Sequence, residues 1–399
     1  MPPERSSRQE GLPTDYYAPD YQIEIEGHEL DAETKGDVLE LKVTMDLENL
    51  TGFDLTINNW DDRTQGNRKF DFKYSDTDTF DVGNRIHIQM GYAGRLLSMV
   101  HGVITSMAPR FSESGPPTLG VSGQDSLVKL RDRKPGPNDI KRFVKKRDEE
   151  IAQIVASRNH LKFKGPQERT ETHAIVIQKD QDEATFLKER AARIDFDCYI
   201  QFDLDSREET LFFVKPIDGR DGRPTRVYVF EWGKSLINFN PQLTIAEQVG
   251  TVTVRGWDPR SKQPIKYTAG PQDLPRSGSG GMSGPQAAQE RLNGKGDIVV
   301  DQPVTSAQEA HDLAISLLRE RAYKYITGSG QVIGLPDLRP GHMVELHGLG
   351  RRFSGTPEKP IPYQVRKVVH SLTGSGYQTQ FEVRSTSDGG TSNKDGGSS

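Results

Sequence analysis

The sequence has little of what secreted and membrane proteins usually contain. It has one cysteine, Cys198, among 399 residues, which excludes an intrachain disulfide framework and suits a reducing compartment. No apolar run reaches the length of a membrane span, and the N-terminus lacks the apolar segment of a signal peptide. We therefore expect a protein that is made in the cytoplasm and does not itself insert into a membrane.

An excess of positive charge is also absent. The 52 Lys and Arg residues are outnumbered by 57 Asp and Glu, for a formal net charge of -5, which argues against general affinity for nucleic acid. The strongest basic run, residues 141–147, is followed directly by Asp-Glu-Glu, a pattern more typical of a solvated face. Hydrophobic residues make up only 33% of the chain, which fits thin domains that share surface with partners.

Motifs for catalysis and metal binding are missing as well. The nine histidines have no paired metal-ligand spacing, and no G-x-S-x-G elbow occurs. Cys198 lies in a strand-like segment, where a core position is favoured over a nucleophile. The acidic loops at 61–62 and 76–78 lack the glycine and terminal Glu of an EF-hand. Four histidines on predicted strands or a helix are expected to be structural: His101, His311, His347 and His370. We predict no catalytic residue, no metal and no cofactor.

The stretch 328–384 is the most informative part of the chain. The turn Leu-Arg-Pro-Gly at 338–341 leads into an alternating strand at 343–346. Two further strands, 364–371 and 377–383, flank the turn Thr-Gly-Ser-Gly at 373–376. This pattern predicts an antiparallel unit with one long hairpin.

The same order of elements occurs earlier in the chain. Residues 82–88 match 340–346, and 102–108 are the counterpart of 364–371, with 118–122 as the return strand. Few residues are identical, so the repeat is one of element order. Two readings remain open: a duplicated unit, or two antiparallel meanders that are alike because turn chemistry recurs.

The remaining patterns predict helices and domain limits. Ile151, Ile154 and Val155 share one helical face, Asp182 can cap a second helix, and Ser306-x-x-Glu309 opens a third. We expect an α+β, mainly β fold with two tube-protein-like antiparallel β-barrels and an α+β insertion between them. The predicted limits are a flexible arm (1–18), a first barrel (19–133), the insertion (134–225), a second barrel (226–268 and 304–385), a Gly/Ser/Pro linker (269–303) and a disordered tail (386–399).

These motifs resemble the late control D family of phage proteins, which supplies baseplate hubs of contractile tails and related injection systems. The likeness extends over most of the chain from about residue 21 to residue 384. The matching residues are Gly334, Leu335, Pro336, Leu338, Arg339, Pro340, Gly341, Phe353, Gly355, Val365, Val368, His370, Gly376, Tyr377, Thr379 and Phe381. The chain also resembles the N-terminal part of valine-glycine-repeat spike proteins, without the spike.

The resemblance implies a structural hub. It would be a homotrimer whose two barrels per chain form a pseudo-sixfold ring that joins a hexameric inner tube to a trimeric spike. Because the chain ends soon after residue 384, we expect the spike protein to be supplied in trans, and we expect other baseplate proteins as partners. Two other classes stay open: a baseplate-associated cell-wall hydrolase, and a surface-binding β protein.

Long hairpins with polar tips are the parts that a barrel can extend toward a neighbouring ring. The two candidates are residues 97–122 and 365–383. Because aromatic and Arg residues dominate interface energies, five residues are predicted to contact partners: Arg110, Phe111, Arg366, Lys367 and Tyr377. The alternative is that both hairpins only complete their own barrels, with Phe111 and Tyr377 packed inside.

Overall fold

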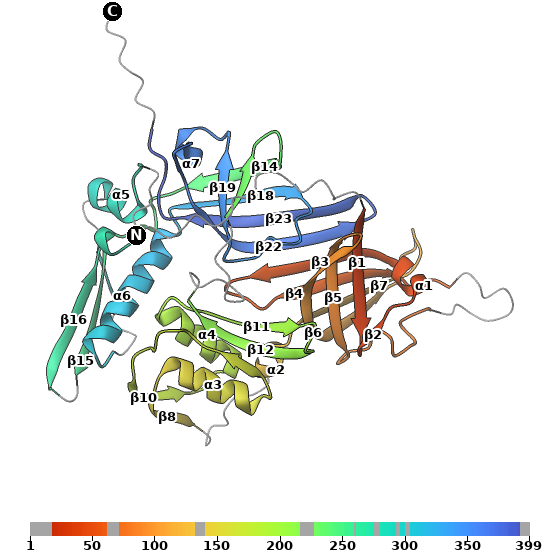
Figure 1. Ribbon diagram of the computed structural model, residues 1–399, viewed down its shortest axis with the longest axis horizontal. Helices are drawn as coiled ribbons and strands as arrows, with labels where there is room; N and C mark the ends of the chain where they lie inside the picture. The colour runs from red at the N-terminus through yellow and green to blue at the C-terminus, as the bar shows by residue number, and fades with distance from the viewer. Residues whose placement is uncertain are drawn as a thin grey trace, which may run out of the picture.

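The computed structural model describes residues 18–61, 72–131, 140–215, 227–258, 261–274, 280–292, 296–299 and 304–391 (Figure 1). The strands are β1 (Pro19–Ile25), β2 (His28–Glu29), β3 (Val38–Asp46), β4 (Gly52–Asn58), β5 (Arg85–Tyr92), β6 (Arg95–Arg110), β7 (Thr118–Asp125), β8 (Lys141–Lys146), β9 (Lys162–Lys164), β10 (His173–Gln178), β11 (Asp197–Asp203), β12 (Glu208–Val214), β13 (Val227–Glu231), β14 (Leu236–Leu243), β15 (Thr251–Asp258), β16 (Gln263–Ala269), β17 (Gly296–Val299), β18 (Ile326–Ile333), β19 (Met343–His347), β20 (Gly355–Thr356), β21 (Lys359–Pro360), β22 (Tyr363–Thr373) and β23 (Gly376–Ser385). The helices are α1 (Ala32–Gly36), α2 (Val128–Arg131), α3 (Asp148–Arg158), α4 (Glu183–Arg193), α5 (Gly284–Arg291), α6 (Ala307–Ala322) and α7 (Arg351–Ser354), with a 3-10 turn at Pro271–Asp273.

One large sheet contains two units of six strands. Unit 1 consists of β1 and β3 to β7, and unit 2 of β13, β14, β18, β19, β22 and β23. When the strands of each unit are numbered along the chain, both sheets run second, third, sixth, fifth, fourth, first. The units differ in the direction of their first strand: β1 is antiparallel to β5, whereas β13 is parallel to β19. The predicted duplication is therefore present in the topology.

Each unit has its own apolar core, built by alternation along the strands. On β3, Leu41, Val43 and Met45 are buried, while Lys42 and Thr44 between them are only half-buried. Such alternation places one side of the sheet against a core and leaves the other accessible. Unit 1 and unit 2 accordingly enclose separate clusters of buried apolar side chains.

Strand β22 makes the two units continuous. Its start pairs with β19, at Val344 opposite Tyr363, and its later residues pair with β3, from Lys367 opposite Asp46 onward. The mainly β fold with two tube-like units is confirmed. The units are not separate closed barrels, since the β3–β22 ladder joins them into one sheet.

The insertion after unit 1 forms as its sequence patterns predict. Helix α3 buries Ile151 and Val155, and α4 is capped by Asp182, whose Oδ1 accepts the backbone N–H of Thr185 at 2.8 Å. These helices pack with the short β8–β10 sheet and with β9, β11 and β12 around a third apolar cluster (Figure 1). Cys198 is buried there on β11, so its predicted core position is confirmed.

The second barrel was predicted to include residues 249–256 and the helix after Ser306, and this is wrong. Strand β15 pairs with β16 and β17 in a separate three-stranded sheet. Its buried Val252 and Val254 belong to the same cluster as Leu313 and Leu318 of α6. Residues alternate along β15, and its apolar side is covered by α6 and not by the strands of unit 2.

The predicted linker and tail also contain ordered structure. Within 269–303 lie α5, capped by the Ser283 hydroxyl, and β17. In the predicted tail, Asp388 is buried, and its backbone N–H donates to the carbonyl oxygen of Met282 at 3.1 Å. Residues 1–17 of the predicted arm and 392–399 of the tail lie outside the described residues. In the described ranges, no helix combines the length and hydrophobicity needed to cross a bilayer.

Candidate assembly interface

The two units repeat down to the irregularities of their ladders. The β6–β7 ladder has a bulge between Ile104 and Ser106, and the β22–β23 ladder has one between Val365 and Lys367. A second pair of bulges follows Val38 on β3 and Leu236 on β14. Because a bulge is a local, sequence-dependent irregularity, two matching pairs argue against two unrelated meanders.

The turn before the fourth strand of each unit is also repeated. The backbone N–H of Gly83 donates to Ile104 O at 2.9 Å, and that of Gly341 donates to Val365 O at 2.8 Å. Both glycines have positive φ, of 100° and 88°, which a residue with a side chain rarely adopts. Ile104 is thus the counterpart of Val365, so residues 364–371 match 103–110 rather than the predicted 102–108.

The segment that begins at Gly334 in unit 2 lies at the joint between the units. Gly334 accepts a hydrogen bond from the Tyr92 hydroxyl at 2.8 Å through its carbonyl oxygen, and its N–H donates to Tyr377 O at 2.9 Å. A Cβ atom at Gly334 would lie 2.2 Å from Cγ of Tyr377, far inside contact distance. The joint therefore requires glycine at this position.

Arg339 extends this joint from unit 2 into unit 1. Its Nη2 donates to the carbonyl oxygen of Ser98 at 2.8 Å, and its Nη1 lies 2.9 Å from the sulfur of Met99. A guanidinium among thioethers is costly to bury unless its donors are used. The contacts to unit 1 are therefore part of what holds Arg339, and with it the two units, in place.

His370 is a structural residue of the same joint, as predicted. Its Nε2 lies 3.1 Å from Leu338 O, and its Nδ1 lies 2.9 Å from the Tyr377 hydroxyl and 3.2 Å from Oγ1 of Thr379. These partners fit a neutral ring that donates from Nε2 and accepts at Nδ1. Complete burial lowers the pKa of His370 to about 3, with the charge of Arg339 adding to the shift.

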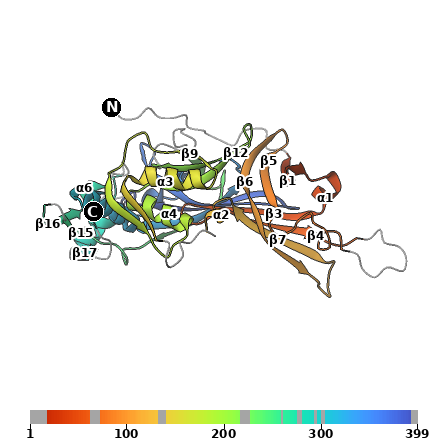
Figure 2. The same ribbon diagram turned by 90° about the horizontal axis from the view of Figure 1, so that it is seen from below.

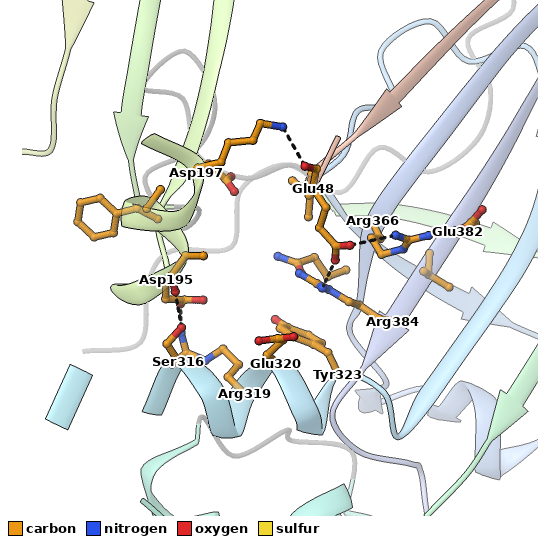
Figure 3. A pocket seen from close by; sticks show the side chains of 18 of the residues that line it. Glu48, Asp195, Asp197, Ser316, Arg319, Glu320, Tyr323, Arg366, Glu382 and Arg384 are labelled. Carbon is orange, nitrogen blue, oxygen red and sulfur yellow. Dashed lines mark hydrogen bonds and ion pairs between the residues drawn. The ribbon is translucent and has the colours of Figure 1, made fainter. Parts of the chain in front are cut away.

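Two of the five predicted interface residues take part in contacts within the chain. Arg366 lies 3.8 Å from Asp46 of unit 1. It also pairs with Glu48 of unit 1 at 3.5 Å and with Glu382 of β23 (Figure 3). Lys367 is 3.4 Å from Glu382. Arg366 thus helps to join the two units of one chain, whereas the ion pair of Lys367 lies within unit 2.

The other three predicted interface residues divide between core and surface. Tyr377 is only 4% exposed and packs in the unit 1 core, with its ring 5.8 Å from that of Tyr92, so its prediction as a surface residue is wrong. Arg110 is exposed, and Phe111 is 62% exposed with its ring 5.0 Å from Phe72. They lie at the end of the β6–β7 hairpin, which projects from the rest of unit 1 (Figure 2).

A large cleft separates the insertion from the sheet. It has a volume of about 1820 Å³ and lies between α4, α6 and the accessible side of unit 2 (Figure 3). Opposite charges on its wall pair with one another: Glu48 contacts both Arg366 and Arg384 at 3.5 Å, and Asp195 pairs with Arg319. Burial raises the pKa of Cys198 at its edge to about 12, which keeps the thiol protonated. Across the described ranges, no three His, Cys, Asp or Glu side chains gather as a metal site would.

Solved structures place this arrangement in the class of tail-protein folds. The 43 kDa tail protein of prophage MuSo2 from Shewanella oneidensis has a TM-score of 0.63 at 14% identity, covering 92% of this chain and 98% of that one. A tail protein from Neisseria meningitidis MC58 has a TM-score of 0.61 at 12% identity, over 92% and 97% of the two chains. The E. coli c3393 protein, a type VI secretion component described as similar to T4 tail proteins gp27 and gp5, has a TM-score of 0.56 at 13% identity, over 93% and 78%. The chain therefore shares its fold with phage tail proteins and with a type VI secretion component.

The chain itself belongs to the family described as the Alg8 N-terminal domain, whose model matches residues 17–372. That match takes in unit 1, the insertion and unit 2 as far as most of β22. No curated protein sequence matches the chain.

Proposed function

We propose that this protein is the baseplate hub of a phage tail or contractile injection system. In this role three copies form a ring that contacts a hexameric inner tube on one side and a trimeric spike on the other. The observation that carries the proposal is the duplicated unit, with its repeated strand order, bulges and glycine turn. The tail-protein fold of the chain supports the same role.

The duplication solves a problem of symmetry. A tube built of hexameric rings has six equivalent subunits to contact, whereas a threefold spike has three. Three chains with two equivalent units each present six similar sheet units to the tube and three identical chains to the spike. A single-unit chain would need six copies, and would then have no threefold feature of its own.

The work of such a hub is mechanical rather than chemical. The polar contacts of the site fix the two units of one chain relative to each other, through Arg339, Arg366 and the β3–β22 ladder. A rigid pair of units gives the first tube ring a fixed template. We place the protein in the baseplate of the particle, after its synthesis in the cytoplasm.

The test of this proposal is the mass of the purified chain by light scattering. A hub of this kind gives three times the 44.6 kDa chain mass, at concentrations down to the low micromolar range. A monomer that binds glycans or cell walls without forming a ring would replace the proposal with the surface-binding alternative. A stable hexamer would also contradict it, because twelve units do not match a sixfold tube.

A further inference from the structure

The β3–β22 ladder joins the two units of one chain. The two strand segments that are equivalent to β3 and to this part of β22 each have one edge with no partner among the described strands. Inside the chain, β3 of unit 1 pairs with residues 367–373 of β22. The counterpart of β3 is β14, which pairs only with β18 among the described strands. The counterpart of that part of β22 is the second half of β6, which beyond Ile104 pairs with β7 alone among the same strands. Among the described strands, each copy therefore carries one free edge of each kind.

The burial of the two edges differs from that of their paired counterparts. Leu41 and Met45 on β3 are buried, whereas the matching Phe239 and Leu243 on β14 are half-buried. Across the ladder, Val368 is buried, whereas the matching Met107 on β6 is half-buried. These apolar side chains lie at alternate positions on the side of the strand that faces the core. They are only half-buried because no further strand among those described lies beside them.

We propose that β14 of one copy pairs antiparallel with residues 106–112 of a second copy, in the register of the β3–β22 ladder. The matching bulges fix this register, because they align β14 with β3 and β6 with β22 residue by residue. Ser371 lies opposite Lys42 within the chain, so Arg110 of the second copy lies opposite Asn240. By the same step, Phe111 lies opposite Phe239. The partner is a second copy of this chain, and the inference rests on the proposed ring.

Two prolines interrupt the proposed ladder at a single pair. Leu47 N–H donates to Arg366 O at 3.1 Å, and along an antiparallel ladder every second pair is hydrogen-bonded, including His370 with Val43. The corresponding pair between copies is Pro109 with Pro241. Neither proline has an N–H to donate, and each ring occupies the space toward the partner strand, so the ladder is interrupted at this one pair and continues on either side of it. Until the copies meet, each proline protects its edge from pairing with unrelated strands.

This pairing closes a ring without a new kind of contact. Each copy offers its β14 edge to the next copy and its β6 edge to the previous one, which is a head-to-tail interface. The contact between copies then repeats the contact between units inside each copy. Both exposed residues predicted at the hairpin, Arg110 and Phe111, lie at this interface.

Cross-linking between cysteines tests the register directly. The double variant Arg110→Cys with Asn240→Cys places two thiols at a non-hydrogen-bonded pair, where Cβ atoms are close enough for a disulfide. Diamide, which takes up two electrons and two protons per disulfide, should convert most of the chain into covalent oligomers on a non-reducing gel. Lys42→Cys with Ser371→Cys is the matched intrachain control, because it occupies the same pair of the β3–β22 ladder. Cys198 stays in place because it is buried.

A shifted pair distinguishes the failure of this inference from that of the proposed function. Arg110→Cys with Asn238→Cys moves one thiol by two residues on the exposed side of β14, and should cross-link much less. If the chain is trimeric by light scattering and the shifted pair cross-links better, the register is wrong while the ring stands. If both pairs stay monomeric on the gel in a trimeric sample, the edges do not meet. If the chain is monomeric, the proposed function fails as well.

A charge test avoids cysteine chemistry. Ala108 and Gln242, both exposed, are opposite each other in the proposed ladder. Ala108→Lys with Gln242→Lys should raise the concentration at which the ring dissociates by about fivefold relative to Ala108→Lys with Gln242→Glu, since facing like charges are unfavourable and facing opposite charges favourable. Equal dissociation of the two double variants would overturn the pairing.

Discussion

Gly334 shows how one residue determines the way two units meet. The ring of Tyr377 occupies the space where a side chain at 334 would be, and the Tyr92 hydroxyl reaches its carbonyl oxygen from unit 1. Arg339 contributes to the joint from the turn that follows Gly334, and His370 contributes from the neighbouring β22–β23 hairpin. The segment from Gly334 to Arg339 therefore fixes how unit 1 and unit 2 lie against each other, and its polar atoms form hydrogen bonds within the chain.

The glycine requirement gives a first prediction. Gly334→Ala should lower the free energy of unfolding by about 1–3 kcal/mol, because the added methyl overlaps the Tyr377 ring and the joint must shift. Gly374→Ala is the matched control, since no atom lies within 4 Å of the position that its added methyl would take. Urea denaturation of both variants provides the measurement. Equal stability of the two would mean that the joint yields without cost.

His370 gives a prediction for pH dependence. Because its pKa in the folded chain is lowered to about 3, only the unfolded state takes up a proton at this ring between pH 6.5 and 3. The folded state therefore loses stability as the pH falls through this window, by up to about 1.4 kcal/mol per pH unit from this group. His370→Gln keeps a donor and an acceptor but does not titrate, so it should show a shallower fall.

The control for that measurement is His28→Gln, which changes an exposed histidine and should leave the pH slope of the parent chain unchanged. Urea midpoints between pH 7 and 5 give the three slopes. A His370→Gln slope equal to that of the parent chain would show that His370 is not a buried neutral group.

At the scale of elements, sequence patterns predict what is local. The helix at 148–158, the Asp182 cap and the Ser306 cap of α6 follow from periodicity and capping chemistry, and all three form. Strand β15 was identified as a strand and assigned to the wrong sheet, because alternation reveals a buried side without naming what covers it. The proposed role of β14 at an edge was not predicted, because it appears only when β14 is aligned with β3.

The candidate interface was predictable to a similar extent. The β6–β7 hairpin and its exposed Arg110 and Phe111 follow from the pattern of the chain. Tyr377 was placed on the surface because aromatic residues are common at interfaces, yet it is buried against Tyr92. A hairpin pattern alone does not reveal which of its sides faces another unit of the same chain.

The hairpin tip gives a prediction at this scale. Deleting residues 113–116, which lie outside the proposed ladder between copies, should leave the trimer intact but block growth of the inner tube from the baseplate, if the projecting tip is what the first tube ring contacts. The control replaces the same residues with a Gly/Ser sequence of equal length, which separates loss of length from loss of side chains. Particles that carry the deletion and still build full-length tubes would exclude the tip as the tube contact.

At the scale of the whole molecule, the chain combines a repeated part with parts that occur once. The sheet units are present twice, whereas the insertion with α3 and α4 and the layer of β15 to β17 with α6 are present once per chain (Figure 1). An assembly of three chains would therefore have two symmetries at the same time. Its six sheet units would be close to sixfold, and its inserted layers would be threefold.

Electron microscopy of the purified assembly, viewed along its axis, tests this account most directly. Class averages calculated without imposed symmetry should show a ring with six similar lobes from the sheet units and three further densities from the inserted layers. The ratio of six to three follows from the duplication within each chain. A ring with one inserted density for every sheet lobe, or particles with no ring at all, would contradict the account.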